Sequence, residues 1–330
     1  IGGVAPADVP TQAMQILVSQ NDKHLLCFGA TPYGGGSFDP LLIRWATQDQ
    51  PNVWTPLVTN SAGFLRVSRG SAIVCAVATR QEILVYTEGT LNSLQFTGTS
   101  DVFSLNELSD NISILSPRSV VVVNNTAYWF GHDKFYAYTG RVETLPCTIR
   151  NHVFQDLNYD QADQIVSGSN EGWNEVWWFY VSNDTAGSTV IDKYVVFNYL
   201  DQVWYFGSLS RTAWLDTSLQ LYPLAADYNS RLLFHENGVN DNSTTATLPI
   251  SAYIQSSDFD IGDGHNFGFV WRILPDLNFN GSNVSSPSVT MTVLPRVNSG
   301  TAYGQSNSPV VQSSNVYSNT QNFYNIQEFT

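Results

Sequence analysis

Charged residues are scarce in this chain of 330 residues, and the two signs are unequal. Asp, Glu, Lys and Arg together make up 13% of the sequence, about half the usual share, with 28 acidic residues against 14 basic ones and a net charge of −14. No run of Lys or Arg occurs. Because a protein that grips nucleic acid must neutralise phosphates with cations, this composition disfavours tight DNA or RNA binding, although DNA could pass such a surface without adhering.

Cysteines and long apolar runs are also rare. Cys27, Cys75 and Cys147 lie far apart, without a CxxC pair or a histidine at ligand spacing. We therefore expect small apolar core residues of a protein made in a reducing cytoplasm, and no disulfide or zinc site. No apolar stretch approaches the roughly 20 residues of a membrane-spanning helix. The chain opens with Ile1-Gly2-Gly3, which is neither an initiator methionine nor a signal peptide, so we expect it to be a fragment.

Aromatic residues are abundant where charge is missing. They make up 13% of the chain. Clusters of Gly, Asn, Asp and Ser interrupt segments rich in Val, Thr and Tyr about every eight to twelve residues, which is typical of short antiparallel strands. Long amphipathic helices would need more charge than this. The composition predicts an all-β protein.

A short aromatic-turn signature recurs three times, with its aromatic residues 42 apart. Its copies are Val53-Trp54-Thr55-Pro56, Gln95-Phe96-Thr97-Gly98 and Ala137-Tyr138-Thr139-Gly140. A second aromatic set precedes it in register, at Trp45, Tyr86 and Tyr128. This interval is the length of one β-propeller blade, and blades stack because a four-stranded sheet alone cannot bury both faces. The repeat predicts a β-propeller of four-stranded blades; a β-sandwich with evenly spaced hairpins is the alternative.

Five blades are recognisable within residues 1–240, and a complete ring could hold six. They are predicted at residues 13–56, 63–98, 101–140, 175–207 and 211–238. In the third blade, Asn124-Asn125 marks a hairpin turn. An insertion near 141–161 carries one short helix at 152–158, capped or ended by Asn158.

The composition changes after residue 240 to Asn, Ser and Thr. Residues 241–330 are predicted to form an additional C-terminal β region. Its strand-like stretches are 250–255, 267–274 and 289–294, and 298–322 is predicted to be a long polar loop or arm.

The sequence carries no recognisable catalytic constellation. Asp boxes and WD40 signatures are absent, and the nearest Asp-box candidate, 182–187, has its glycine one place late and no Trp. No Ser, Cys or carboxylate is arranged locally around a histidine as a triad or dyad requires. We predict that the protein is not an enzyme, that it needs no cofactor, and that its histidines lie in turns or at the surface: His24, His132, His152, His235 and His265.

One acidic segment is a weak candidate metal site. Asp258, Asp260 and Asp263 alternate in a Gly-rich turn and could present oxygens to Ca²⁺. Compared with an EF-hand loop, the segment lacks the ligand at the fifth position, the Gly at the sixth and the Glu at the twelfth. An acidic turn between strands is the alternative interpretation.

Several long strings, in order, resemble the tail nozzle or tail hub proteins of short-tailed bacteriophages. They are DKFYAYTGRVETLPC at 133–147, NEGWNEVWWFY at 170–180, DKYVVFNY at 192–199, RTAWLD at 211–216 and SSDFDIGDG at 256–264. The similarity covers most of residues 73–274. Members of this family continue past the position of Thr330, so the resemblance implies that both ends are missing here.

The resemblance implies a structural virion protein that is made in the bacterial host and located in the phage tail. Its propeller subunits would form a hexameric ring between an adaptor ring and a needle or gate, with fibre proteins attached in some relatives. The genome would be ejected through the channel of this ring, without specific DNA binding.

Two rival functions remain open at this stage. A carbohydrate-binding or carbohydrate-active propeller would expose Trp and Tyr rings beside carboxylates, where they could stack on sugars. An extracellular adhesion module is also compatible with the low charge. A structural role instead predicts a buried aromatic core that includes Trp129, Trp177, Trp178 and Trp204.

Overall fold

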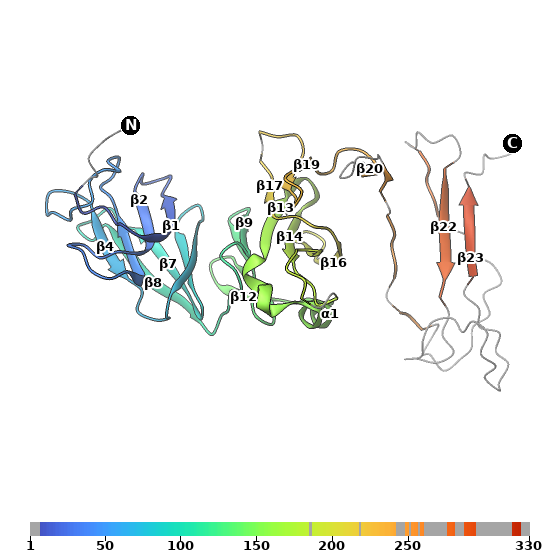
Figure 1. Cartoon of the computed structure of the whole chain (residues 1–330), viewed down its shortest axis with the longest axis horizontal. Helices are drawn as coiled ribbons and strands as arrows, with labels where there is room; N and C mark the ends of the chain where they lie inside the picture. Colours follow the sequence, from blue (N-terminus) through green and yellow to red (C-terminus); the bar gives the residue numbers. More distant parts are fainter. Residues whose placement is uncertain are drawn as a thin grey trace. The chain divides into compact units, whose positions relative to one another are not determined.

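The computed structural model of the chain describes residues 7–184, 187–217, 219–241, 248–250, 252–256, 258–260, 276–280, 287–294 and 319–324 (Figure 1). The chain divides into two compact units, Ile1–Ile250 and Ser251–Thr330. This division falls ten residues after the boundary expected from the composition.

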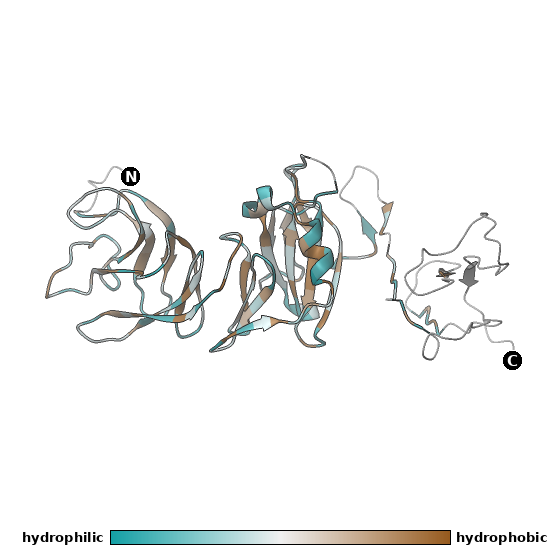
Figure 2. Ribbon diagram, turned by 90° about the horizontal axis from the view of Figure 1, so that it is seen from below, coloured by the Kyte–Doolittle hydropathy of each residue, from teal (hydrophilic) through white to brown (hydrophobic). Residues whose placement is uncertain are grey.

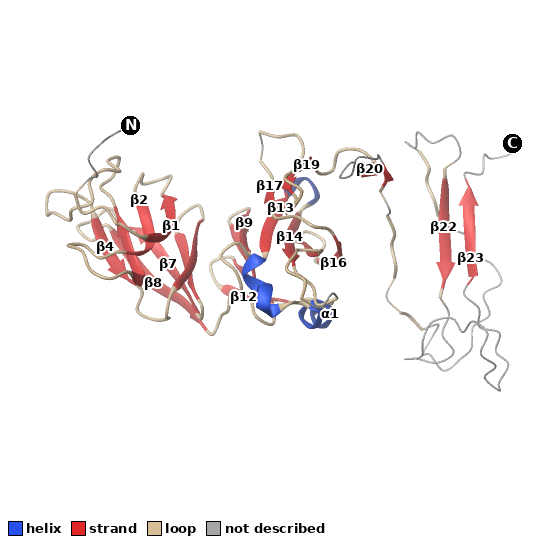
Figure 3. Ribbon diagram, viewed as in Figure 1, coloured by secondary structure: helices blue, strands red, loops and turns tan. Residues whose placement is uncertain are grey.

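Four sheets make up most of the first unit, and each consists of four consecutive antiparallel strands (Figure 3). The first sheet is β1 Ala13–Val18, β2 Leu25–Ala30, β3 Asp39–Trp45 and β4 Gly63–Arg66; the second is β5 Ile73–Ala78, β6 Ile83–Thr87, β7 Thr90–Phe96 and β8 Phe103–Asp110. The third is β9 Val120–Val123, β10 Thr126–Phe130, β11 Phe135–Tyr138 and β12 Val142–Leu145; the fourth is β13 Val166–Asn170, β14 Glu175–Tyr180, β15 Lys193–Asn198 and β16 Val203–Ser208.

A fifth sheet has three strands, β17 Ala213–Leu215, β18 Leu224–Ala226 and β19 Leu232–Phe234. The short pair β20 Asn240–Asp241 and β21 Leu248–Pro249 follows it. The fold is therefore all-β and of the β-propeller type, as the repeat predicted, with each sheet forming one blade.

Successive sheets pack face against face. The first strand of each lies beside the first strand of the next, in the order β1, β5, β9, β13, β17. Hydrophobic stretches run along the strands of the sheets (Figure 2). Every joint holds an aromatic pair, with ring centroids 5.0 to 5.3 Å apart: Trp45 with Phe103, Tyr86 with Trp129, Phe135 with Trp178, and Trp177 with Trp214.

Polar bonds reinforce the joints. The Gln15 side chain of β1 both donates to the Ala76 carbonyl and accepts from the Ala76 N–H of β5, each at 2.7 Å. At the last joint, the Trp214 indole N–H donates to the Ser169 carbonyl at 2.6 Å. These bonds satisfy polar groups that the stacked sheets remove from water.

The predicted frame of the blades is wrong by about one strand in the first three sheets, and the predicted fourth blade, 175–207, misses its first strand, β13. Residues 51–56 form a loop whose Trp54 packs against the first sheet, and the fourth strand of that sheet is β4 at 63–66. The second sheet extends beyond Gly98 to Asp110, and the third sheet runs from 120 to 145. Sequence spacing could not separate an aromatic in a covering loop from one in a strand, because Trp54 in the loop and Tyr138 in a strand are both buried.

The three copies of the aromatic signature are consequently not equivalent. Phe96 and Tyr138 each end the third strand of their sheet, whereas Trp54 lies in the loop. In the second aromatic set, Trp45 ends the third strand of its sheet, whereas Tyr86 and Tyr128 lie in the second strands of theirs. The 42-residue repeat thus relates the second and third sheets alone.

The predicted insertion near 141–161 is partly a blade strand, because β12 completes the third sheet. The predicted helix exists as α1 Arg150–Asp156. Asn158 does not end it; the Asn158 side chain accepts from the Asp160 N–H at 3.1 Å and caps a following 3₁₀ helix, Tyr159–Gln164. The predicted hairpin turn at Asn124-Asn125 is confirmed, with φ values of 49° and 65°.

In the second unit, β22 Ser288–Val293 pairs with β23 Asn319–Tyr324. The strand predicted at 289–294 is confirmed, while β23 replaces the end of the predicted polar loop. No strand forms among residues 252–255, although a strand-like stretch was predicted there. The stretch at 267–274 lies outside the described residues.

Removing a buried indole tests the blade assignment. Trp177 of β14 is 8% exposed and packs on Phe179, Tyr194 and Trp214. We expect Trp177→Ala to lower the free energy of unfolding by about 3–5 kcal/mol, measured by urea denaturation, because it leaves a cavity. Trp173, which is 58% exposed, provides the control. Trp173→Ala should change stability by less than about 0.5 kcal/mol, and equal effects at the two sites would contradict the assignment.

The joint between the fourth and fifth sheets requires a glycine. A Cβ at Gly168 would lie 2.2 Å from Cδ1 of Trp214, whereas a Cβ at Gly172 would meet nothing nearer than Oδ1 of Asn170 at 3.9 Å. We expect Gly168→Ala to displace the Trp214 ring and loosen the fifth sheet, which limited proteolysis should detect as faster cleavage after residue 208. Gly172→Ala should be cleaved like the parent protein.

Candidate functional site

Two carboxylates meet at the joint between the fourth and fifth sheets. The Asn170 amide donates to Oε2 of Glu175 at 3.3 Å and to Oε1 of Glu236 at 3.4 Å. Glu175 also accepts from the indole N–H of Trp177 at 2.9 Å and from the hydroxyl of Tyr205. Both oxygens of Glu175 are therefore occupied by donors from its own sheet.

The electrostatics of this pair follow from burial and like charge. Burial, and then the neighbouring Glu175 carboxylate, raises the pKa of Glu236. Burial and the hydrogen bond to Glu175 raise the pKa of Tyr205. A carboxyl group with a raised pKa beside a second carboxylate is the kind of arrangement used for general acid and base catalysis. Here, however, the hydrogen bonds to Glu175 connect β13, β14 and β16, so they hold three strands of the fourth sheet together.

A second polar network joins helix α1 to the fourth sheet. Lys193 Nζ lies 3.1 Å from Oδ2 of Asp156 and 2.5 Å from Oδ2 of Asp184. Although burial alone would lower it, these carboxylates raise the pKa of Lys193. The Tyr180 hydroxyl donates to Asp156 at 3.0 Å. Because Asp156 is the last residue of α1, its ion pair with Lys193 of β15 holds the helix against the fourth sheet.

Indole exposure separates a structural core from a sugar-binding surface. Among the tryptophans that the structure describes, Trp173 has an exposed ring and Trp214 is half-buried. The four predicted core tryptophans, Trp129, Trp177, Trp178 and Trp204, are confirmed as buried. Trp45 and Trp54 are buried as well. These six rings are packed inside the protein and are not available for stacking on a sugar.

The prediction that every histidine lies in a turn or at the surface is wrong for His24. It is fully buried, its Nδ1 donates to the Ala46 carbonyl at 2.8 Å, and Nε2 has no hydrogen-bond partner. The ring packs against Phe96 and Phe103 of the second sheet. No local signal marks this position, because the aromatic partners lie about 70 or more residues away in sequence.

The other described histidines differ among themselves. His132 and His152 are exposed, as predicted, and lie against Tyr159 and Phe206. His235 is half-buried, and its Nε2 accepts from Nε of Arg211 at 2.9 Å. His265 lies outside the described residues.

The candidate metal site is described only in part. Asp258 and Asp260 are exposed, and Asp263 lies outside the described residues. Within the part of the chain that the structure describes, no group of three or more His, Cys, Asp or Glu side chains could hold a metal ion. The calcium site therefore stays a prediction.

The cysteines are free thiols. Cys27 and Cys75 are buried, as predicted, and burial raises the pKa of the Cys27 thiol to about 11 and that of Cys75 to about 12. Cys147 is half-buried, and its pKa is raised to about 11, again by burial. Thiols with raised pKa values are poor nucleophiles at neutral pH.

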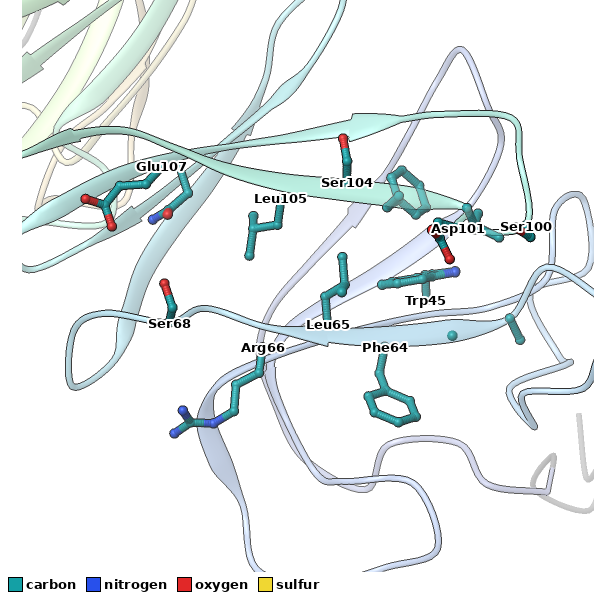
Figure 4. A pocket seen from close by; sticks show the side chains of 15 residues that line it. Trp45, Phe64, Leu65, Arg66, Ser68, Ser100, Asp101, Ser104, Leu105 and Glu107 are labelled. Carbon is teal, nitrogen blue, oxygen red and sulfur yellow. The ribbon is translucent and has the colours of Figure 1, made fainter.

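A groove of about 560 Å³ lies between the outer strands of the first and second sheets, β4 and β8. In Figure 4, Leu65 and Leu105 point into it from the two sides, with Trp45 nearby, whereas Phe64 and Arg66 point away. Both β4 and β8 are edge strands of their sheets. The groove is large enough for several side chains of a partner segment, and no sequence pattern indicated it, because it depends on how two sheets splay.

Comparisons with known proteins identify no family for the chain. No family model and no curated protein matches it. Among solved structures, the extracellular domain of a one-component system from B. thetaiotaomicron shares 8% identity at a TM-score of 0.38, over 71% of this chain and 34% of that one. The N-terminal domain of Nup159 shares 11% identity at a TM-score of 0.32, over 74% of this chain and 80% of that one.

The chain thus spans about a third of the length of the first of these domains. Similarities with such low identity and TM-score assign no function to this chain. In the described part of the chain, no helix has both the length and the apolar character needed to cross a membrane.

The His235 contact predicts a pH dependence. Burial and the adjacent Arg211 lower the pKa of His235 to about 4. The unfolded chain takes up this proton near pH 6.5 and the folded chain only near pH 4, so protonation favours unfolding and stability falls as the pH drops between these values. We expect His235→Gln to lose less stability than the parent protein between pH 7 and pH 4.5, by at most about 3 kcal/mol. If urea denaturation gave the two proteins the same change in unfolding free energy over this pH range, the assigned environment of His235 would be wrong.

Proposed function

We propose that the chain is a structural subunit of a short bacteriophage tail, part of the nozzle or hub ring through which the genome is ejected. In this role it would dock adaptor, needle or gate, and fibre proteins. The observation that carries the proposal is where four of the five family-like strings fall. They lie in β11–β12, β13–β14, β15 and β17, which are strands of the third, fourth and fifth sheets. They also supply both rings of two aromatic joints, Phe135 with Trp178 and Trp177 with Trp214.

The charge distribution supports passage of DNA without adhesion. Of the 14 basic residues, eight are ion-paired or buried in the described part of the chain. The ion-paired ones are Lys23, Arg66, Arg69, Arg141, Arg150 and Lys193, and the buried ones are Arg44 and Arg211. With a net charge of −14 and few available cations, phosphates would meet mainly like charge.

The stacked sheets suit a load-bearing ring component. Their joints are filled by large aromatic side chains and tied by hydrogen bonds such as those of Gln15 and Trp214. Densely packed interiors of this kind transmit force with little deformation. Partner proteins could dock at loops and in the groove between β4 and β8 without disturbing the joints.

A carbohydrate-binding propeller is the second candidate. One observation favours it, namely the exposed ring of Trp173, which follows the carboxylate of Glu171 by two residues. A glycan site built on this single indole would need further exposed rings, and six of the other described tryptophans are buried.

Electron microscopy of the purified chain tests the proposed function. We expect rings of six subunits around an open pore, because a nozzle must surround its DNA. Analytical ultracentrifugation over a hundredfold range of concentration should show the same assembly. Monomers alone at the highest concentration would overturn the proposal, and binding to a glycan array that Trp173→Ala abolishes would favour the second candidate.

A further inference from the structure

The groove between β4 and β8 is bordered by open main-chain groups as well as by side chains. Just past β4, the N–H of Val67 donates to the Leu41 carbonyl at 3.0 Å, in the register that pairs β4 with β3. Hydrogen-bonded pairs alternate along an antiparallel ladder. Leu65 is therefore bonded to β3, whereas Phe64 and Arg66 direct their N–H and C=O groups out of the sheet. The edge of β4 thus presents donors and acceptors that an added strand could pair with.

The side chains at this edge alternate between the groove and the opposite face. Figure 4 shows Leu65 pointing into the groove and Phe64 pointing away from it. Leu105 of β8 points in from the other side, and the groove is also lined by the buried rings of Trp45 and Phe103. Successive side chains of any strand point to opposite faces. A strand added along β4 would therefore direct every second side chain into an apolar groove.

Of the two edge strands that border the groove, β4 is the better one for strand addition. Its pairing with β3 runs without a bulge. The pairing of β8 with β7 shifts register between Leu91 and Asn92. Arg69 also forms ion pairs with Glu107 and Asp110 of β8, at 3.1 and 3.4 Å. Bulges and charged side chains are features that keep an edge strand from accepting a further strand.

The charged groups around the groove favour a basic occupant. Arg66 is paired with Asp39 at 2.7 Å, and Glu107 is paired with Arg69. Asp101, in contrast, is exposed, lines the groove and takes part in no ion pair among the described residues. One carboxylate at the groove is therefore available to a cation from outside, and complementary charge of this kind helps to select a partner.

We propose that this groove binds an extended segment of a partner protein, which adds to the edge of β4. Alternate apolar side chains of the segment would lie between Leu65 and Leu105, and a Lys or Arg of the segment would lie beside Asp101. In strand addition, main-chain hydrogen bonds supply affinity and the pockets for alternate side chains supply specificity. This inference deepens the proposed function and rests on it for the source of the segment, which would be another protein of the tail.

Designed peptides test the binding mode on the full chain. The probes are fluorescent heptapeptides with Lys at both ends, Ser at the third and fifth positions, and Val, Leu, Phe or Tyr at the second, fourth and sixth. Fluorescence anisotropy should show at least one of them binding the parent protein with a dissociation constant below about 100 μM.

Methylating the peptide nitrogens distinguishes strand addition from side-chain docking. Two forms of the best probe are compared, one N-methylated at its serines and the other at its apolar residues. Because only alternate amides face the neighbouring strand, one form should bind at least about tenfold more weakly and the other within about threefold of the unmodified probe.

Protein variants locate the binding to the groove. Leu65→Ser should weaken binding of the best probe at least about tenfold, because it removes apolar surface from the groove. Phe64→Ser is the matched control on the other face of the same strand and should bind within about twofold of the parent protein. Asp101→Asn should weaken binding about two- to fivefold, as expected for one exposed ion pair. Thermal unfolding identifies any variant that does not fold, and the methylated probes then decide the question on the parent protein.

Three outcomes would overturn the proposal. They are no binding of any probe at about 1 mM protein, equal loss for the two methylated forms, and equal binding by Leu65→Ser and Phe64→Ser. The proposed function is judged separately by electron microscopy. Rings of six subunits that bind no probe would refute the strand addition alone. Monomers that bind the probes as described would keep the groove as a peptide site and refute the tail function.

Discussion

The structure depends on one constraint: the four-stranded sheets have apolar faces, and neighbouring sheets, covering loops and helix α1 must keep these faces from water. The sheets therefore stack in sequence order, and the stacking sets the position of every large aromatic residue in the joints. The 0% exposure of Trp129 and Trp178 follows from this arrangement. So does the absence of a side chain at Gly168, where the ring of Trp214 occupies the space that a Cβ would need.

Burying so many indoles creates a second requirement, because each indole N–H must find an acceptor. The protein meets it with main-chain carbonyls of neighbouring segments, such as Ser61 for Trp45, Ser119 for Trp178 and Pro146 for Trp204, at 2.8 to 2.9 Å. The loops that supply these carbonyls are thereby held against the sheets. The aromatic core thus orders the connections as well as the strands.

The stacking constraint also explains where the protein can interact. Sheets that splay at their outer edges leave a groove such as that between β4 and β8. Polar clusters elsewhere are largely satisfied internally, as Glu175 and Lys193 show. The proposed tail function therefore relies on packing surfaces and net charge, without reacting groups.

Much of the fold was accessible from sequence, since hydrophobic runs and strand alternation are local properties. The strands β14, β15 and β16 fill the predicted fourth blade, 175–207, to within one residue, and the three-stranded fifth sheet lies within the predicted 211–238. The blade frame was not accessible. Trp54 and Phe96 carry the same local pattern, yet one covers a sheet from a loop and the other ends a strand.

The candidate sites divide in the same way. Composition by itself determined the low charge, the acidic excess and the high aromatic content, because these are sums over residues that no fold can change. Tertiary structure alone decided that His24 is buried, that Glu236 meets Glu175, and that a groove lies between β4 and β8. Each of these depends on contacts between residues that are distant in the chain, and sequence spacing holds no record of them.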